Sequence, residues 1–214
     1  MEVRRIMFKL KIDKDYMCIR HDIHKKSTIE LKEGVTVLVG CNGSGKSTLI
    51  RQIIDHVKQN EIPYIYYDNL VDGGANAKDR AGNLEDFGTL ATLLTSSEGE
   101  EIIENVGNFI FDVGKFCSGH KNDKDIFILL DAFDSGLSID NIDELKSVFN
   151  LIIKDNKNAN VYIIVAANTY EVARNEQCFD VNTCEYIEFT NYNEYRKFVL
   201  KSRQKKEYRK RKEL

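Results

Sequence analysis

A run of glycines, one lysine and two hydroxyl residues stands out in the first quarter of the chain. Gly40-Cys41-Asn42-Gly43-Ser44-Gly45-Lys46-Ser47-Thr48 fits the pattern G-x-x-x-x-G-K-[ST] at every fixed position. Glycines let a backbone wrap tightly, so that its N–H groups point at phosphate oxygens, and the N-terminus of a following helix adds positive partial charge at the same place. We therefore expect a nucleotide's phosphates to be bound by Asn42, Gly43, Ser44, Gly45, Lys46, Ser47 and Thr48.

Two side chains of this run have distinct expected tasks. Lys46 should reach the β- and γ-phosphates, and the Ser47 hydroxyl should bind Mg²⁺. The flanks agree with this interpretation, because 35–39 is a β-branched apolar run typical of a buried strand and 48–54 has the pattern of a helix. The alternative is a chance glycine-rich turn, but strand, turn and helix in this order are the context that the motif requires.

A second candidate lies 85 residues after Lys46, where the apolar strand 126–131 ends in Asp131. This is the placement of a Walker B carboxylate, which holds Mg²⁺ directly or through water. A buried strand that ends in aspartate is common, so Asp131 gains its weight from the phosphate loop. Together the two segments predict a site for ATP and Mg²⁺.

The elements that position these residues alternate between strands and helices. The segment 6–39 reads as strands that pair in antiparallel fashion before the loop, and later strands and helices alternate, which predicts a mainly parallel sheet flanked by helices. The fold class is therefore α/β of the P-loop NTPase type, with residues 1–192 as one domain and 193–214 as a basic helical tail. Later strands are expected at 62–67, 126–131, 161–166 and 186–189, helices at 84–94, 97–116 and 138–154, and a loop at 68–82.

Composition limits the class of protein. Of 214 residues, 42% are hydrophobic and 30% are charged, which fits a globular protein, and no apolar run approaches the roughly 18 residues of a membrane span. The start of the chain lacks the apolar core of a signal peptide, so a cytoplasmic location is expected. The five cysteines are odd in number and show no CxxC spacing, which favours free thiols.

Charge is distributed unevenly. Residues 201–214 carry eight basic and two acidic side chains, a formal +6, whereas the rest of the chain carries −9. Such a tail could neutralise the phosphates of a nucleic acid, although a solvated charged helix is the simpler interpretation. The basic residues are Lys201, Arg203, Lys205, Lys206, Arg209, Lys210, Arg211 and Lys212.

Three stretches resemble the ABC-type ATPases. The run 129–137, LLDAFDSGL, resembles their "LLDEPxSGLD" segment, and the phosphate loop has their asparagine before Gly-Ser-Gly. Residues 96–100, SSEGE, resemble the "LSxGE" signature of the soluble branch, which includes chromosome-maintenance and double-strand-break-repair ATPases. The resemblance covers about residues 6–189.

The resemblance implies a mode of action. Two ABC cassettes meet head to tail with ATP between one phosphate loop and the other's signature helix, so Ser97 would contact a γ-phosphate in an ATP-dependent homodimer. Ser97 could equally cap its own helix. Tyr16 lies roughly where the family places an aromatic that stacks on adenine, although a strand tyrosine usually serves packing. The guanine-selecting motif Asn-Lys-x-Asp is missing, which favours ATP.

The chain also departs from the family at four positions. Ser138 stands where the family has an aspartate after Leu137, and Asp140 could substitute for it. Ala132 stands where a catalytic glutamate follows Walker B, a loss that commonly costs about 10²–10⁴-fold in rate, and Asp134 is the candidate substitute. The Q-loop glutamine of the family is missing, because no glutamine lies between Gln59 and Gln177, and Asp68 or Asn69 could replace it. Asn168 stands at the switch-histidine position, where it could hydrogen-bond a γ-phosphate but not take a proton.

Three functions fit these observations. The first is an ATPase that hydrolyses slowly, dimerises around ATP and acts on DNA or a protein partner. The second is a nucleotide-gated binding module with little turnover, which Ala132 favours. The third is a kinase, which is ranked last because Arg51 and Arg80 are the only arginines between Lys46 and Lys154 to supply a lid.

Overall fold

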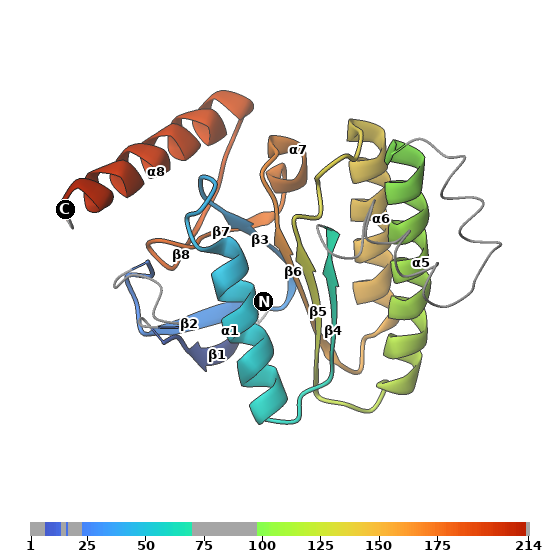
Figure 1. Cartoon of the computed structure of the whole chain (residues 1–214). Helices are drawn as coiled ribbons and strands as arrows, with labels where there is room; N and C mark the ends of the chain where they lie inside the picture. The colour runs from blue at the N-terminus through green and yellow to red at the C-terminus, as the bar shows by residue number, and fades with distance from the viewer. Residues whose placement is uncertain (1–6, 14–15, 17–22, 70–97, 213–214) are drawn as a thin grey trace, which may run out of the picture.

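A twisted, mainly parallel sheet forms the centre of the computed structural model, which describes residues 7–13, 16, 23–69 and 98–212 (Figure 1). Within these ranges the sheet has six strands in the order β4-β5-β6-β3-β7-β8. The strands from β4 to β7 pair in parallel, and β8 pairs antiparallel with β7. The bounds are β3 Gly34–Val39, β4 Tyr64–Asp68, β5 Asp125–Asp131, β6 Asn160–Ala166, β7 Gln177–Asp180 and β8 Glu185–Ile187.

Different elements cover the two faces of the sheet (Figure 1). Helices α5 (Glu98–Gly119), α6 (Ile139–Asp155) and α7 (Tyr170–Ala173) pack on one face. Helix α1 (Lys46–Gln59) packs on the other, together with the antiparallel pair β1 (Met7–Lys11) and β2 (Thr28–Lys32). The fold class predicted from the sequence is thus confirmed, including the small antiparallel sheet near the N-terminus.

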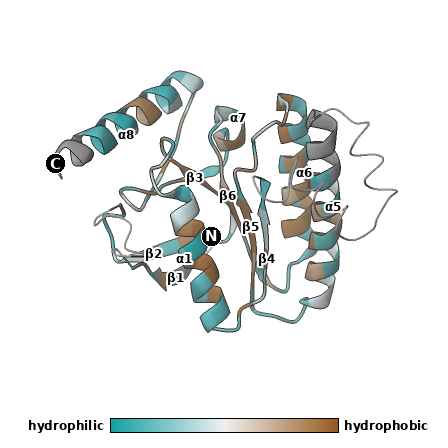
Figure 2. Ribbon diagram, viewed as in Figure 1, coloured by the Kyte–Doolittle hydropathy of each residue, from teal (hydrophilic) through white to brown (hydrophobic). Residues whose placement is uncertain are grey.

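Alternation along the strands divides the core between these faces. In β6, Val161, Ile163 and Val165 belong to the cluster under α5 and α6, whereas Tyr162 and Ile164 belong to the cluster under α1. The central strands β5 and β6 are apolar on both faces because both faces are covered (Figure 2). Helix α1 is fixed by four side chains with no exposed surface, each contributing about 1.5–3 kcal/mol by burial: Leu49, Ile50, Ile53 and Val57.

The order of the strands decides what meets at the carboxyl edge of the sheet. Strand β6 lies between β3, which leads into the phosphate loop, and β5, which ends in Asp131. Because parallel strands end at the same edge, the loop after β3, Asp131 and the turn after β6 come together there. This edge is the usual place for ligands in open α/β sheets.

Helix α8 (Tyr192–Lys212) follows β8 and crosses this edge (Figure 1). Most of its length is hydrophilic (Figure 2), but Tyr195 is buried and Phe198 and Val199 pack against the core. The helix begins one residue before the predicted tail. None of the described helices is apolar over a stretch long enough to span a membrane.

The sequence missed two short elements. Strand β7 and helix α7 have four residues each, too few to show a periodic pattern. The predicted helix at 84–94 lies outside the described residues, as does all of the predicted 68–82 loop beyond Asn69, whereas Asp68 ends β4.

Candidate nucleotide-binding site

The phosphate loop turns directly from β3 into α1. Gly45 caps α1 in the left-handed region at φ 106°, and a Cβ atom there would collide with Ile23. Gly43 is also left-handed, at φ 69°. Only glycine adopts such a conformation without strain in so tight a space, so the sequence pattern and the backbone geometry agree. The first N–H groups of α1 have no acceptor within the helix, and they lie beside the cavity next to the loop.

Lys46 is the first residue of α1 and is only 9% exposed. Its Nζ donates a hydrogen bond to the Gly40 carbonyl oxygen at 3.0 Å, at the start of the same loop. Burial lowers the pKa of Lys46, and the nearby carboxylates of Asp131 and Asp134 partly oppose this shift. A buried ammonium group beside a glycine-rich loop at the start of a helix is a site that an anion would stabilise.

Ser47 and Asp131 meet although they are far apart in the sequence. The Ser47 hydroxyl donates a hydrogen bond to Asp131 Oδ1 at 3.0 Å, and the Ala132 N–H donates to the same oxygen at 2.9 Å. Burial raises the pKa of Asp131 and the Asp68 carboxylate adds to this, while the hydrogen bond from Ser47 lowers it. A hydroxyl beside a carboxylate is a donor set that suits Mg²⁺, whose charge would favour the ionised form of Asp131.

A cavity of about 490 Å³ lies between these groups. Its lining includes most of the residues predicted to bind phosphate or metal: Asn42, Gly43, Gly45, Lys46, Ser47, Thr48, Asp131 and Asn168. Ser44 is buried and does not line the cavity. The sequence analysis did not single out Ile23, Ser135 and Ala166, which also line it.

Asp134 does not line the cavity. It is 5% exposed, and its Oδ2 accepts hydrogen bonds from the backbone N–H groups of Asn168 at 2.8 Å and Thr169 at 2.6 Å. Both donors belong to the turn after β6. Asp134 therefore holds that turn through Oδ2, whereas its Oδ1 is buried and has no hydrogen-bond partner among the described residues.

Asn168 is held through its backbone on both sides. Asp134 accepts from its N–H, and its carbonyl oxygen accepts a hydrogen bond from the Tyr195 hydroxyl of α8 at 2.8 Å. Its side chain is exposed and lines the cavity. The geometry thus places an amide side chain, fixed by a clamped backbone, beside the phosphate loop.

Neither candidate for the missing glutamine lines the cavity. Asn69 donates hydrogen bonds to the carbonyl oxygens of Ala132 at 3.3 Å and Ser135 at 2.7 Å. Asp68 accepts a hydrogen bond from the Tyr66 hydroxyl at 3.2 Å. Asn69 therefore supports the segment after Asp131, in which Ala132 is left-handed at φ 50°.

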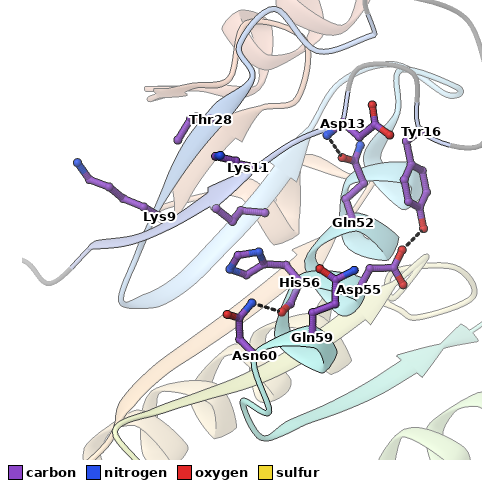
Figure 3. A pocket seen from close by; sticks show the side chains of 11 residues that line it. Lys9, Lys11, Asp13, Tyr16, Thr28, Gln52, Asp55, His56, Gln59 and Asn60 are labelled. Carbon is purple, nitrogen blue, oxygen red and sulfur yellow. Dashed lines mark hydrogen bonds between the residues drawn. The ribbon is translucent and has the colours of Figure 1, made fainter.

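Tyr16 lies at a different cavity, of about 690 Å³, between β1 and α1 (Figure 3). Its hydroxyl donates a hydrogen bond to Asp55 Oδ2 at 2.6 Å, and burial with the Asp55 carboxylate raises the pKa of Tyr16 to about 12. The two cavities share no lining residue. This placement gives the predicted stacking on adenine no support, and Ser97 lies outside the described residues.

Helix α8 contributes contacts that no motif indicated. The Cys41 N–H donates to the Ser202 hydroxyl at 3.3 Å, and Lys206 Nζ donates to the Asn42 carbonyl oxygen at 2.7 Å. Sequence patterns predict a charged helix here, but they cannot indicate which face of it meets the phosphate loop. The four described cysteines are free thiols, Cys41 among them.

These features define a class of protein. A glycine-rich loop between a parallel strand and a helix, with a lysine, a hydroxyl and a strand-terminal aspartate around one cavity, is the arrangement of a P-loop nucleoside-triphosphate-binding domain. The chain belongs to the ATPase_2 family, described as an ATPase domain predominantly from Archaea, whose model matches residues 26–213. Membership supports ATP use, while the resemblance to the ABC branch stays a prediction. A search of curated proteins found no match.

Proposed function

We propose that the protein binds Mg-ATP in the cavity beside the phosphate loop and hydrolyses it slowly. The observation that carries this proposal is the hydrogen bond of 3.0 Å between Ser47 and Asp131, made next to the buried Lys46 ammonium group. One cavity is thus lined by the three features expected of a phosphoryl-transfer site: the glycine-rich loop, the hydroxyl and the strand-terminal carboxylate.

Each group has a task in this proposal. The N–H groups of the loop and of the first turn of α1 bind phosphate oxygens, and Lys46 contributes its charge at the β- and γ-phosphates. Ser47 and Asp131 would hold Mg²⁺, which when bound neutralises charge on the β- and γ-phosphate oxygens. Asn168, which lines the same cavity, can donate its amide N–H₂ to a terminal phosphate oxygen.

The expected slowness follows from the carboxylates. Among the described residues, Asp131 is the one carboxylate that lines the cavity, and it accepts a hydrogen bond from the Ser47 hydroxyl. Asp134 does not line the cavity and its Oδ2 accepts from two backbone amides, and Ala132 carries no acid. Without a general base to activate water, a rate lower by about 10²–10⁴-fold than that of a complete site is expected.

The test measures nucleotide binding and phosphate release on the same samples. Wild type should bind Mg-ATP, whereas Lys46→Ala and Asp131→Ala should bind it at least about 10-fold more weakly. Thermal unfolding of each variant without nucleotide shows whether the fold is intact. Wild-type affinity for ATP that is unaltered by either substitution would contradict the proposal.

A second candidate is a nucleotide-gated module with little or no turnover. Its support is the clamp that joins the cavity to α8: Asp134 holds the Asn168 N–H, and Tyr195 of α8 holds the Asn168 carbonyl. Phosphate release measured with and without DNA separates the candidates. A turnover well above about one per minute, slow against typical enzymes, would exclude the switch-only version.

The finer proposals concern assembly. An ATP-dependent head-to-tail homodimer that acts on DNA or a protein partner is supported by the sequence resemblance around residues 96–100 and 129–137. Mass measurement in solution, with and without Mg-ATP, tests it on wild type and Lys46→Ala. Doubling of the mass in wild type alone is expected, and an unchanged mass would count against the dimer. Transfer of labelled γ-phosphate to an acceptor other than water would revive the kinase alternative.

A further inference from the structure

The phosphate loop is in contact with a second lysine, which comes from α8. Lys206 Nζ lies 2.7 Å from the Asn42 carbonyl oxygen. It also lies directly against Gly43, because a Cβ atom added to that glycine would overlap Lys206 Nζ. Asn42 and Gly43 both line the phosphate cavity, so the ammonium group of Lys206, which lines the adjoining cleft, contacts two residues of the cavity wall.

The two lysines lie at the same end of the loop. Lys46 Nζ bonds to the Gly40 carbonyl, two residues before the Asn42 carbonyl that Lys206 contacts. Lys46 is the side chain that reaches the β- and γ-phosphates in this motif. The position of Lys206 therefore corresponds to the terminal-phosphate end, not to the end where the base and sugar would lie.

The charges around Lys206 leave it available to an anion. Among the described residues it forms no ion pair, since its neighbour Glu207 bonds to Arg203 at 3.1 Å. An ammonium group has three N–H donors, and the Asn42 carbonyl takes one.

Helix α8 is anchored so that this contact can report on the nucleotide. The Cys41 N–H bonds to the Ser202 hydroxyl one turn earlier, and the Tyr195 hydroxyl bonds to the Asn168 carbonyl near the start of the helix. A second cleft, lined in part by Asn42, Asn168 and Lys206, separates α8 from the loop and shares Asn42 and Asn168 with the phosphate cavity. A change at the terminal phosphate thus has a direct structural route to α8.

We propose that Lys206 contacts the terminal phosphate of a bound nucleoside triphosphate, so that the protein prefers a triphosphate to a diphosphate and α8 is held more firmly when the triphosphate is bound. This inference rests on the proposed function, because it assigns a further residue to the same site. It differs from a purely structural role, in which Lys206 would only fasten α8 to the loop and both nucleotides would bind alike.

The test compares the affinities for fluorescent ATP and ADP analogues, with Mg²⁺, in wild type, Lys206→Ala, Lys206→Arg and Lys205→Ala. The last is the matched control, since it removes the same charge from the adjacent, exposed position of the same helix. Lys206→Ala should weaken ATP binding by about 10-fold and ADP binding by less than about twofold, Lys206→Arg should restore most of the difference, and Lys205→Ala should match wild type. Equal losses for both nucleotides, or no loss, would overturn the inference.

A second readout follows α8 itself. Hydrogen exchange of the backbone amides of residues 196–205 should be slower with ATP than with ADP in wild type, and this difference should vanish in Lys206→Ala. Equal exchange with both nucleotides in wild type would overturn the link to α8. Wild type that binds neither nucleotide would instead refute the proposed function, so the two failures are distinguishable.

Discussion

Asp134→Ala is expected to destabilise the turn after β6 and, through it, the nucleotide site. The Asp134 carboxylate is 5% exposed and accepts two backbone hydrogen bonds, from Asn168 at 2.8 Å and Thr169 at 2.6 Å. Alanine leaves both N–H groups of this part-buried turn without their acceptor. The turn carries Asn168 into the phosphate cavity, so the substitution should act on stability and on ATP affinity together.

The magnitude follows from the number and type of bonds. A hydrogen bond to a charged acceptor contributes about 1.5–3 kcal/mol, and two are lost, while relief from burying the carboxylate offsets part of the cost. We expect a net loss of about 3 kcal/mol in the free energy of unfolding. For a chain of this size that corresponds to a fall in Tm of about 6–12 °C.

Asp134→Asn is the matched control, because its carbonyl oxygen can still accept from both amides. Its loss should be about 1 kcal/mol, which reflects weaker neutral bonds and a buried NH₂ group. Thermal and urea unfolding of wild type and both variants, with and without Mg-ATP, measure the difference. The reasoning would be refuted if Asp134→Asn were as unstable as Asp134→Ala. If Asp134 were instead the general base, Asp134→Asn would keep its stability and lose hydrolysis as fully as Asp134→Ala.

Three further predictions concern the cavity itself. Asp131→Asn should raise the Tm of the nucleotide-free protein at neutral pH and weaken Mg²⁺-dependent ATP binding. Burial raises the pKa of Asp131 above its usual 3.8, so the charged carboxylate disfavours folding at neutral pH. Below pH 3.8 the carboxyl group is protonated in both states, and the gain in Tm should disappear. Lys46→Met should likewise keep or raise the Tm without nucleotide, since burial lowers the pKa of the ammonium group, yet weaken ATP binding by about 100-fold or more in a titration; retained affinity would contradict this assignment. Ala132→Gly should stabilise the protein by up to about 1 kcal/mol in urea unfolding, because glycine removes the strain of φ 50°, and a loss of stability would argue against strain there.

The fold and the centre of the site could be predicted from the sequence because both depend on local patterns. Apolar runs that end in loops or carboxylates predicted β3, β5 and β6, and the G-x-x-x-x-G-K-[ST] spacing fixes Lys46 and Ser47 relative to each other over one loop. The Walker B placement of Asp131 predicted its approach to the loop, and parallel strands that end at a common edge make that approach possible.

The remainder depends on side-chain directions and long-range packing. The choice between catalysis and support for Asp134 rests on which way its carboxylate points, and no sequence pattern specifies that direction. Tyr16 joins Asp55, and Lys206 joins Asn42, across 39 and 164 positions of the sequence, with no periodicity to indicate either contact. Ala166 and Ile23 carry no reactive group, so a search for chemistry passes over them.

Ala166 ends strand β6, which lies between β3 and β5, and its small side chain leaves room for a ligand. The phosphate loop arches over the end of β6 to bring Ser47 to Asp131, and Ala166, 1% exposed, forms part of the floor beneath that arch. A leucine or phenylalanine at this position would fill the space that phosphates need while leaving every residue of the loop motif unchanged. Among sequences that share this fold, the size of the last residue of that strand is therefore a criterion for separating nucleotide binders from chains that retain the motif but have lost the room for a ligand.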